Sequence, residues 1–151
     1  MSGHLRAIWI KRAKYGPMDP ATAAQLVTGR GIAGNANQGG KRQVTIIEEE
    51  LWQDTMDRMA SDLPPATRRA NLMVRGVRLV ESRGKVLRVG DVRIRIYGET
   101  HPCERMDDAI PGLQQVMRSD WRGGAFGEVL NDAAIQVGDL VEWEELDESA
   151  S

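Results

Sequence analysis

The chain of 151 residues has one cysteine, two histidines and few aromatic residues, namely four tryptophans, two tyrosines and one phenylalanine. A single cysteine cannot form an intramolecular disulfide, so we expect a reducing compartment, the cytoplasm. No apolar run approaches the roughly 18 residues of a membrane span. The N-terminus, MSGHLRAIWIKRAKYG, lacks the pattern of a secretory signal. These absences argue against disulfide-stapled, secreted and membrane-spanning proteins.

The net charge is only -2, but the charges are unevenly placed along the chain. Residues 1–46 carry seven basic side chains against one acid, Asp19, whereas residues 139–151 carry six acids and no base. The basic part could face an anionic ligand, and residues 144–151 are predicted to form an acidic tail. A long basic stripe with interleaved aromatic residues is missing, so we expect no nucleic-acid partner.

The length suits one domain with one buried core, and we predict a single domain over residues 1–151 with its core at about 5–143. Short segments of alternating apolar residues, separated by turn signals, favour a mainly β, barrel-like fold with a few short helices. Residues 15–40 have a weak pattern and many glycines, which predicts a flexible or tightly turned region. Strands are predicted at 5–10, 43–47, 71–74, 86–89, 92–96, at 135 and at 140–143, and helices from about 48, at 104–110 and at 113–117. A further segment around 126–130 has no assigned type.

The cysteine lies in the stretch Thr100-His101-Pro102-Cys103-Glu104-Arg105-Met106, between a predicted strand and a predicted helix. Such joints hold a side chain at the mouth of a rigid sheet. A thiolate is a nucleophile and a soft metal ligand, and the neighbouring His101 and Arg105 would favour it. Free cysteine is also among the most buried residue types. Local sequence therefore leaves a reactive thiol and an inert buried side chain as equal alternatives.

Other motifs carry less information. The histidines lie far apart without further ligands at metal spacing, so a structural zinc site has little support. Residues 29–34 match G-x-G-x-x-G, but no clear strand precedes them and no amphipathic helix follows, which excludes a dinucleotide motif. Followed by Lys41 and Arg42, these glycines could still wrap an anion, or form a mobile loop.

The order of several short pieces resembles the MOSC domain, the module named after the C-terminal part of molybdenum cofactor sulfurases. The resemblance covers roughly residues 5–143, nearly the whole chain. No single piece is decisive, and their order together with the single cysteine makes the match specific. The pieces are Gly31–Asn35, Arg42–Ile46, Arg69–Val77, Leu87–Asp91, Pro102–Met106, Gly123–Phe126 and Val137–Asp139.

The resemblance implies a β-rich barrel that binds molybdenum cofactor or carries sulfur for metal-sulfur chemistry. Cys103 matches the family cysteine, and would ligate molybdenum or carry a persulfide. The pterin cofactor ends in a phosphate, for which basic side chains and glycine-rich backbone are the expected partners. The candidate cofactor-binding residues on this sequence are Arg69, Asn71, Arg105, Lys41, Arg42, Arg122, Gly34, Asn35 and His101.

The chain also departs from the family pattern. The family commonly has Gly-Asp followed by His where this chain has Asn35 and Asn37, and Glu where it has Ala70. These changes remove proton donors and acceptors. Two hypotheses remain, a domain whose cysteine takes part in an oxidoreductase or sulfur-transfer reaction, and a non-catalytic module that binds an anion.

The resemblance also bears on partners and on a second cofactor. A stand-alone module would need a cysteine desulfurase to supply sulfur, or a redox partner to supply electrons, and its small-molecule substrate is unknown. We expect no pyridoxal phosphate, which would need a Schiff-base lysine, and only Lys41 of the four lysines lies near the proposed site.

Overall fold

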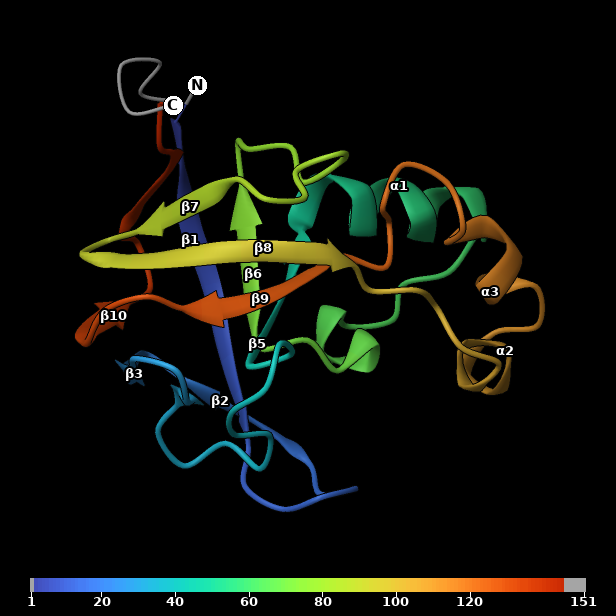
Figure 1. The fold of residues 1–151 in the computed structure, drawn as a ribbon. Coiled ribbons are helices and arrows are strands. Elements are labelled where there is room, and N and C mark those ends of the chain that lie inside the picture. The colour runs from blue at the N-terminus through green and yellow to red at the C-terminus, as the bar shows by residue number, and fades with distance from the viewer. Residues whose placement is uncertain (1, 146–151) are drawn as a thin grey trace.

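The computed structural model describes residues 2–145, and seven strands within this range close into a barrel (Figure 1). Their order around the barrel is β1, β11, β7, β8, β9, β5 and β6, and β6 pairs with β1 to complete the ring. The barrel strands are β1 (Ser2–Lys11), β5 (Val44–Glu48), β6 (Leu72–Arg75), β7 (Val86–Val89), β8 (Val92–Glu99), β9 (Ala125–Val129) and β11 (Leu140–Trp143).

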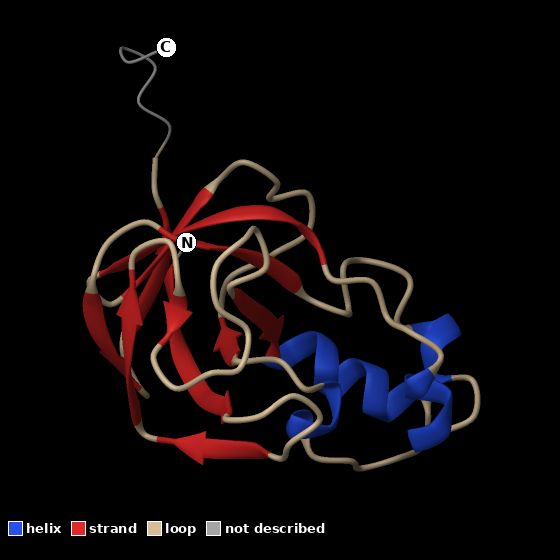
Figure 2. Cartoon of the chain, turned by 60° about the horizontal axis from the view of Figure 1, so that its bottom comes forward, coloured by secondary structure: helices blue, strands red, loops and turns tan. Residues whose placement is uncertain are grey.

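The remaining elements lie outside the ring of strands. Strand β2 (Met18–Ala21) pairs with β1, and β3 (Ala23–Val27), β4 (Gly31–Ile32) and β10 (Ala133–Gln136) form a second, small sheet. The helices are α1 (Glu49–Arg58), α2 (Arg105–Ala109) and α3 (Leu113–Val116), with a short 3-10 helix, η1, at Pro65–Arg68. Figure 2 shows the three α-helices gathered on one side of the barrel. None of the helices in the described residues is long and apolar enough to cross a membrane.

The barrel interior is a packed apolar core, which the alternating sequence pattern predicts. In β8, Val92, Ile94 and Ile96 are buried, whereas Arg93 and Arg95 between them are not. Each large aliphatic side chain removed from water contributes about 1.5–3 kcal/mol to the free energy of unfolding. The barrel is therefore filled mainly by side chains of its own strands, with Leu26, Ile32 and Ile135 of the small sheet in the same cluster, and a ligand must bind at its ends or outer surface.

A second apolar cluster joins the helices to one another. Trp52 and Met56 of α1 pack with Met106, Leu113 and Met117 from the α2 and α3 region. The helical spacing of Trp52 and Met56 is what predicts α1 from the sequence. Since α2 begins two residues after Cys103, this cluster anchors the segment that follows the thiol.

The predicted strands and helices are confirmed within one to three residues, and the Gly90-Asp91 pair forms the turn between β7 and β8. Gly90 has a φ of +56°, as expected for a two-residue hairpin loop with glycine first. The region 15–40, in contrast, contains the three strands β2, β3 and β4, which the weak pattern did not predict. β2 and β3 are short and mostly half-exposed, and β4 consists of only two residues, both buried. β2 includes Pro20, which an edge strand tolerates.

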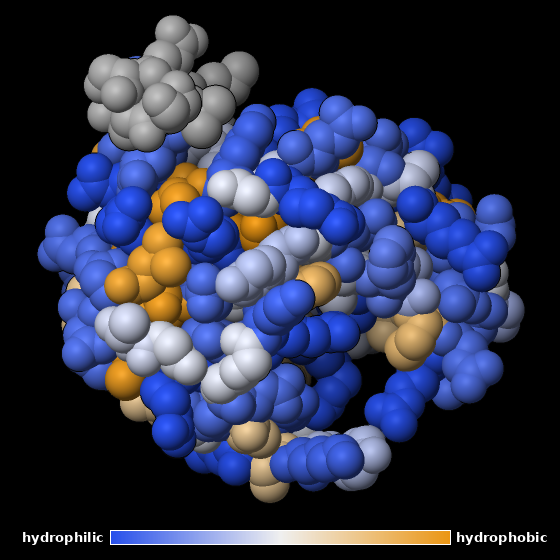
Figure 3. Space-filling view, in the orientation of Figure 1, coloured by the Kyte–Doolittle hydropathy of each residue, from blue (hydrophilic) through white to orange (hydrophobic). Residues whose placement is uncertain are grey.

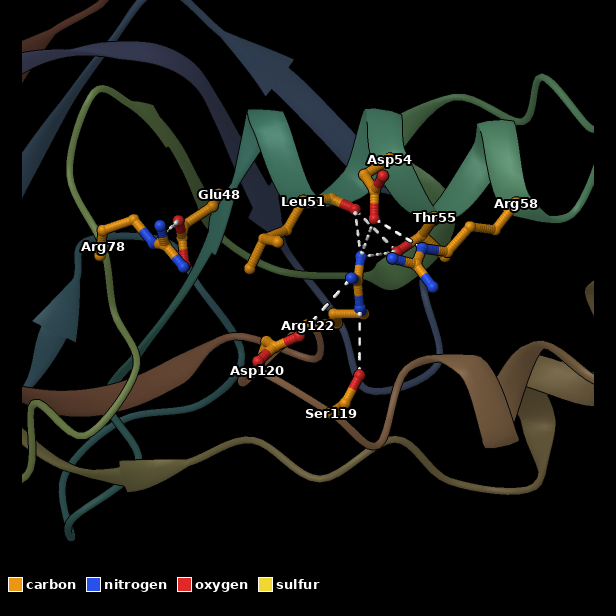
Figure 4. Close-up of polar contacts among 9 residues, drawn as sticks. All are labelled: Glu48, Leu51, Asp54, Thr55, Arg58, Arg78, Ser119, Asp120 and Arg122. Atoms are coloured by element: carbon orange, nitrogen blue, oxygen red, sulfur yellow. Dashed lines mark hydrogen bonds and ion pairs between the residues drawn. The ribbon is translucent and has the colours of Figure 1, made fainter.

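Glu48 is a buried acid at the junction of β5 and α1 (Figure 4). Its carboxylate accepts a hydrogen bond from the backbone N–H of Leu79 at 3.2 Å, and Arg78 lies 3.9 Å away. Burial raises the pKa of Glu48 to about 7, although Leu79 and Arg78 oppose the shift. Ionisation of this buried carboxyl group therefore costs free energy in the folded protein.

We predict that Glu48→Gln removes a pH dependence of stability. The folded state holds a proton on Glu48 up to about pH 7, whereas the unfolded state loses it near 4.5, so ionisation destabilises the fold between these values. Relative to the variant, the free energy of unfolding of the native chain should fall by on the order of 2–3 kcal/mol as the pH rises through this window. Urea unfolding of both proteins at pH 4.5, 6 and 7.5 checks this, and parallel curves would contradict it.

Candidate functional site

Cys103 lies in the connection between β8 and α2, and its side chain is exposed. The backbone on both sides is fixed, because Thr100 N donates to Gly124 O at 2.8 Å and Met106 N donates to Cys103 O at 3.0 Å. The exposed position contradicts the alternative of an inert buried cysteine. The structure instead presents the thiol to solvent on an anchored loop.

Arg68, at the end of η1, is a buried arginine that clamps this loop. Its Nε donates to Gly123 O at 3.0 Å, and its Nη2 donates to the carbonyl oxygens of Thr100 and His101 at 3.3 and 3.5 Å. No carboxylate of residues 2–145 lies within 4 Å of its guanidinium. Burial lowers the pKa of Arg68, Arg42 lowers it further, and a negative charge on Cys103 would raise it. A desolvated cation without a counter-charge therefore lies beside the thiol.

Arg69 and Arg105 connect the loop between β1 and β2 to this region. Arg69 has a φ of +64° and donates from Nη2 to Gly16 O at 2.6 Å. The guanidinium of Arg105 lies 5.5 Å from the ring centroid of Tyr15, the neighbour of Gly16. Both predicted binding residues thus reach the same loop, one from η1 and one from α2.

Further basic side chains complete a group that we call the cation cluster, Lys11, Lys14, Arg42, Arg68, Arg69 and Arg105. Partial burial lowers the pKa of Lys11, and so do the charges of Arg69, Arg42 and Lys14. Within residues 2–145, no member of the cluster forms an ion pair at 4 Å or less. Figure 3 shows a hollow with hydrophilic walls between the barrel and the helices, above the loop that joins β1 to β2. The arrangement attracts anions.

The predicted residues Asn35 and Asn71 form a buried network under the cluster. Asn35 Oδ1 accepts hydrogen bonds from the backbone N–H of Lys11 at 2.9 Å and from Asn71 Nδ2 at 3.1 Å. Asn71 Nδ2 also donates to Trp9 O, and Asn71 Oδ1 accepts from the backbone N–H and the hydroxyl of Thr45. The side chain of Asn71 is therefore fully engaged in joining β1, β5 and the start of β6, and through Asn35 it fixes the backbone of Lys11.

Three other predicted residues lie at the edge of the site or point elsewhere. Gly34 has a φ of +86°, and a Cβ there would lie 3.2 Å from Arg12 Nη1. His101 is exposed, with Nδ1 3.7 Å from a carboxylate oxygen of Glu99. Lys41 lies over the ring of Tyr97, 5.8 Å from its centroid, on the outer side of β8.

Arg122 is directed toward α1 (Figure 4). It contacts Asp54 at 2.7 Å, Thr55 Oγ1 at 3.2 Å and Asp120 at 3.6 Å, and it is almost fully buried. Through these contacts the guanidinium of Arg122 joins α1 to the segment before β9. The structure brings Arg42, Arg69 and Arg105 into the cation cluster, and it does not bring Arg122 there.

Sequence reasoning missed Arg68 as a site residue, as well as Lys11, Lys14 and Tyr15. Arg68 and Arg69 are adjacent and identical in type, and nothing in their local sequence tells which one is buried. The early excess of basic residues was the only signal for Lys11 and Lys14.

The protein offers few ligands for a metal ion. No cluster of three or more His, Cys, Asp and Glu side chains occurs among the residues that the structure describes. Cys103 is a single soft ligand, so a metal held here would depend on further ligands from a cofactor.

The fold and the site together define a small closed barrel that presents one thiol beside cations that have no carboxylate partner within residues 2–145. A family model described as "MOSC domain" matches residues 31–142, and the chain belongs to this family. The resemblance predicted from the sequence is thereby confirmed. No curated protein sequence matches the chain.

Solved structures share the fold at low sequence identity. YuaD from Bacillus subtilis has a TM-score of 0.80 and 18% identity over 97% of this chain and 98% of its own. YiiM from Geobacillus stearothermophilus has a TM-score of 0.76 and 15% identity over 95% of this chain and 75% of its own. YiiM from Escherichia coli has a TM-score of 0.71 and 16% identity over 95% and 71%. At this identity the likeness concerns the fold alone.

We predict that Asn71→Ala destabilises the protein by about 2–3 kcal/mol, because it removes the side-chain partner of the Thr45 N–H and of the buried Trp9 O and one of the two hydrogen bonds to Asn35 Oδ1. Asn37→Ala is the matched control, since Asn37 is exposed, and it should change the free energy of unfolding by less than about 0.5 kcal/mol. Urea titrations measure both values. Equal effects of the two substitutions would argue against the network.

Proposed function

We propose that this protein binds the molybdenum cofactor, with Cys103 as a ligand of molybdenum or as the carrier of a persulfide sulfur. The observation that carries the proposal is the exposed thiol beside the buried guanidinium of Arg68, which has no carboxylate partner within residues 2–145. Membership of the MOSC family, which is linked to molybdenum cofactor sulfurases, supports the same chemistry.

The residues present fit such a cofactor. A thiolate suits a soft metal centre, and the single protein ligand suits a metal that already carries the sulfur atoms of its pterin. Arg42 and Arg69 offer guanidinium groups that can donate paired hydrogen bonds to the cofactor phosphate. When bound, the cofactor would supply a metal centre that exchanges electrons and transfers an oxygen or sulfur atom.

The protein residues would then hold charge rather than move protons. Arg68 offsets the negative charge of the Cys103 thiolate and fixes the loop through the carbonyl groups of Thr100 and His101.

As a sulfur carrier, Cys103 would need a partner that brings sulfane sulfur. Its thiolate would attack the terminal sulfur of a persulfide on a cysteine desulfurase, form a new S–S bond and release the partner's cysteine as a thiolate. The exposure of Cys103 permits this contact. An oxidoreductase role would instead need a redox partner to supply electrons.

A second candidate is a non-catalytic module that binds an anion. The absence of an acid at Ala70, which is buried, and the commitment of Asn35 and Asn71 to structural hydrogen bonds favour it. In this case the cation cluster would bind a phosphate-bearing ligand without chemistry at Cys103.

We expect that protein purified from a molybdenum-replete host contains molybdenum and pterin, and that Cys103→Ser lowers the molybdenum content by more than about 10-fold. Serine is smaller and harder than the thiolate and is a poor ligand for a soft site, while the exposed position tolerates it. Elemental analysis and pterin fluorescence of the denatured protein measure the two components.

The control is Arg88→Gln, which removes an exposed cation from β7, and it should leave both contents unchanged. Retention of pterin with loss of molybdenum in Cys103→Ser would support the role of the thiol as a metal ligand. Absence of pterin from the native protein and from Cys103→Ser alike would favour the anion-binding module.

A further inference from the structure

The cation cluster holds more positive charge than one phosphate group can offset. Six side chains gather there, and none has a carboxylate within 4 Å among the residues described. A phosphate monoester brings at most about two negative charges at neutral pH. Burial is the largest cause of the lowered pKa of Lys11, and the like charges of Arg69, Arg42 and Lys14 lower it further. The cluster is therefore suited to a ligand with more than one phosphate.

The outer part of the cluster is built on a fixed turn between β1 and β2. Gly16 N donates to Ala13 O at 2.8 Å and closes the turn, while Arg69 Nη2 holds the carbonyl oxygen of Gly16 at 2.6 Å. Tyr15, inside this turn, adopts a φ of +64°, a conformation that side chains with a Cβ seldom take. Such conformations persist where the surroundings impose them, and they are common at ligand sites.

Tyr15 exposes its ring to solvent on the turn between β1 and β2 instead of burying it. The residue is 71% exposed, and two cations flank its ring, Lys14 Nζ at 5.2 Å and the Arg105 guanidinium at 5.5 Å from the centroid. Arg105 follows Cys103 by two residues, so the ring belongs to the same site as the thiol. An exposed aromatic ring among cations is a stacking platform for a planar, phosphate-bearing ligand.

We propose that this face binds a ligand with two linked phosphates and a planar heterocyclic ring, which is the chemistry of a nucleoside diphosphate. The diphosphate lies on the cation cluster and the ring stacks on Tyr15. The proposal rests on the proposed function, because it describes the anion bound beside Cys103, and it adds a second phosphate and a stacked ring to that anion. A small ligand fits better than a nucleic-acid strand, because Arg69 and Arg105 converge on the one turn between β1 and β2 and the cations do not form a long stripe.

Calorimetric titration of the full chain with ADP, pyrophosphate, inorganic phosphate and adenosine tests the proposal. ADP should bind most tightly, pyrophosphate more weakly and phosphate more weakly still. Tyr15→Ala should weaken ADP binding by roughly 10-fold and leave pyrophosphate binding within about twofold, whereas Tyr15→Phe should bind ADP as the native chain does. Lys11→Gln should weaken ADP and pyrophosphate alike, and Arg88→Gln, with the same loss of charge, should weaken neither.

Equal affinities for phosphate and pyrophosphate would show that the site does not recognise a second phosphate. An unchanged ADP affinity in Tyr15→Ala would show that the ring does not stack on Tyr15. Tighter binding of a single-stranded oligonucleotide than of ADP would contradict the proposal that the ligand is a small molecule. Because Tyr15 is exposed, its variants should unfold at the same temperature as the native chain. Failure of the native chain to bind ADP counts against this inference, whereas absence of molybdenum and pterin from the native chain with normal ADP binding counts against the proposed function alone.

Discussion

Closure of the barrel depends on the long strand β1, which pairs with three partners in succession. Ser2–His4 pairs with β11, His4–Ile8 with β6, and Ile8–Lys11 with β2. The register shifts between Leu5 and Ala7, and such an irregularity bends a strand and lets it follow a curved sheet. Without β1, β11 and β6 would each expose an unpaired edge, and the apolar interior would open to water.

The candidate site begins where β1 ends. The backbone N–H of Lys11 donates to Asn35, Asn35 accepts a second bond from Asn71, and Asn71 in turn bonds Thr45 of β5. This buried network fixes the end of β1 relative to the strands that close the barrel. Arg68 then ties η1 to the segment that carries Cys103, so the barrel and the thiol are held by polar contacts with defined directions.

The arginine side chains have different partners on the two sides of the molecule. On the helical side Arg122, Arg58 and Arg75 pair with acids of α1, and their charges are offset within the fold. At the site Arg68 and Arg42 have no such partner among residues 2–145. A chain with a net charge of only -2 thereby creates a local excess of positive charge, which is a property of the arrangement and not of the composition.

Local periodicity determined much of this protein from the sequence by itself, including most of the barrel strands, the β7–β8 hairpin and the joint at Cys103, because alternation and turn residues act over a few positions. It did not predict β2, β3 and β4, because β2 and β3 are short and mostly half-exposed and β4 is only two residues long, too short to carry an apolar pattern. Only the tertiary structure decided that Arg68 is buried beside the thiol while Arg122 pairs with Asp54. The surroundings of a guanidinium consist of carbonyl and carboxylate groups from segments distant in sequence, and these meet only when the barrel closes.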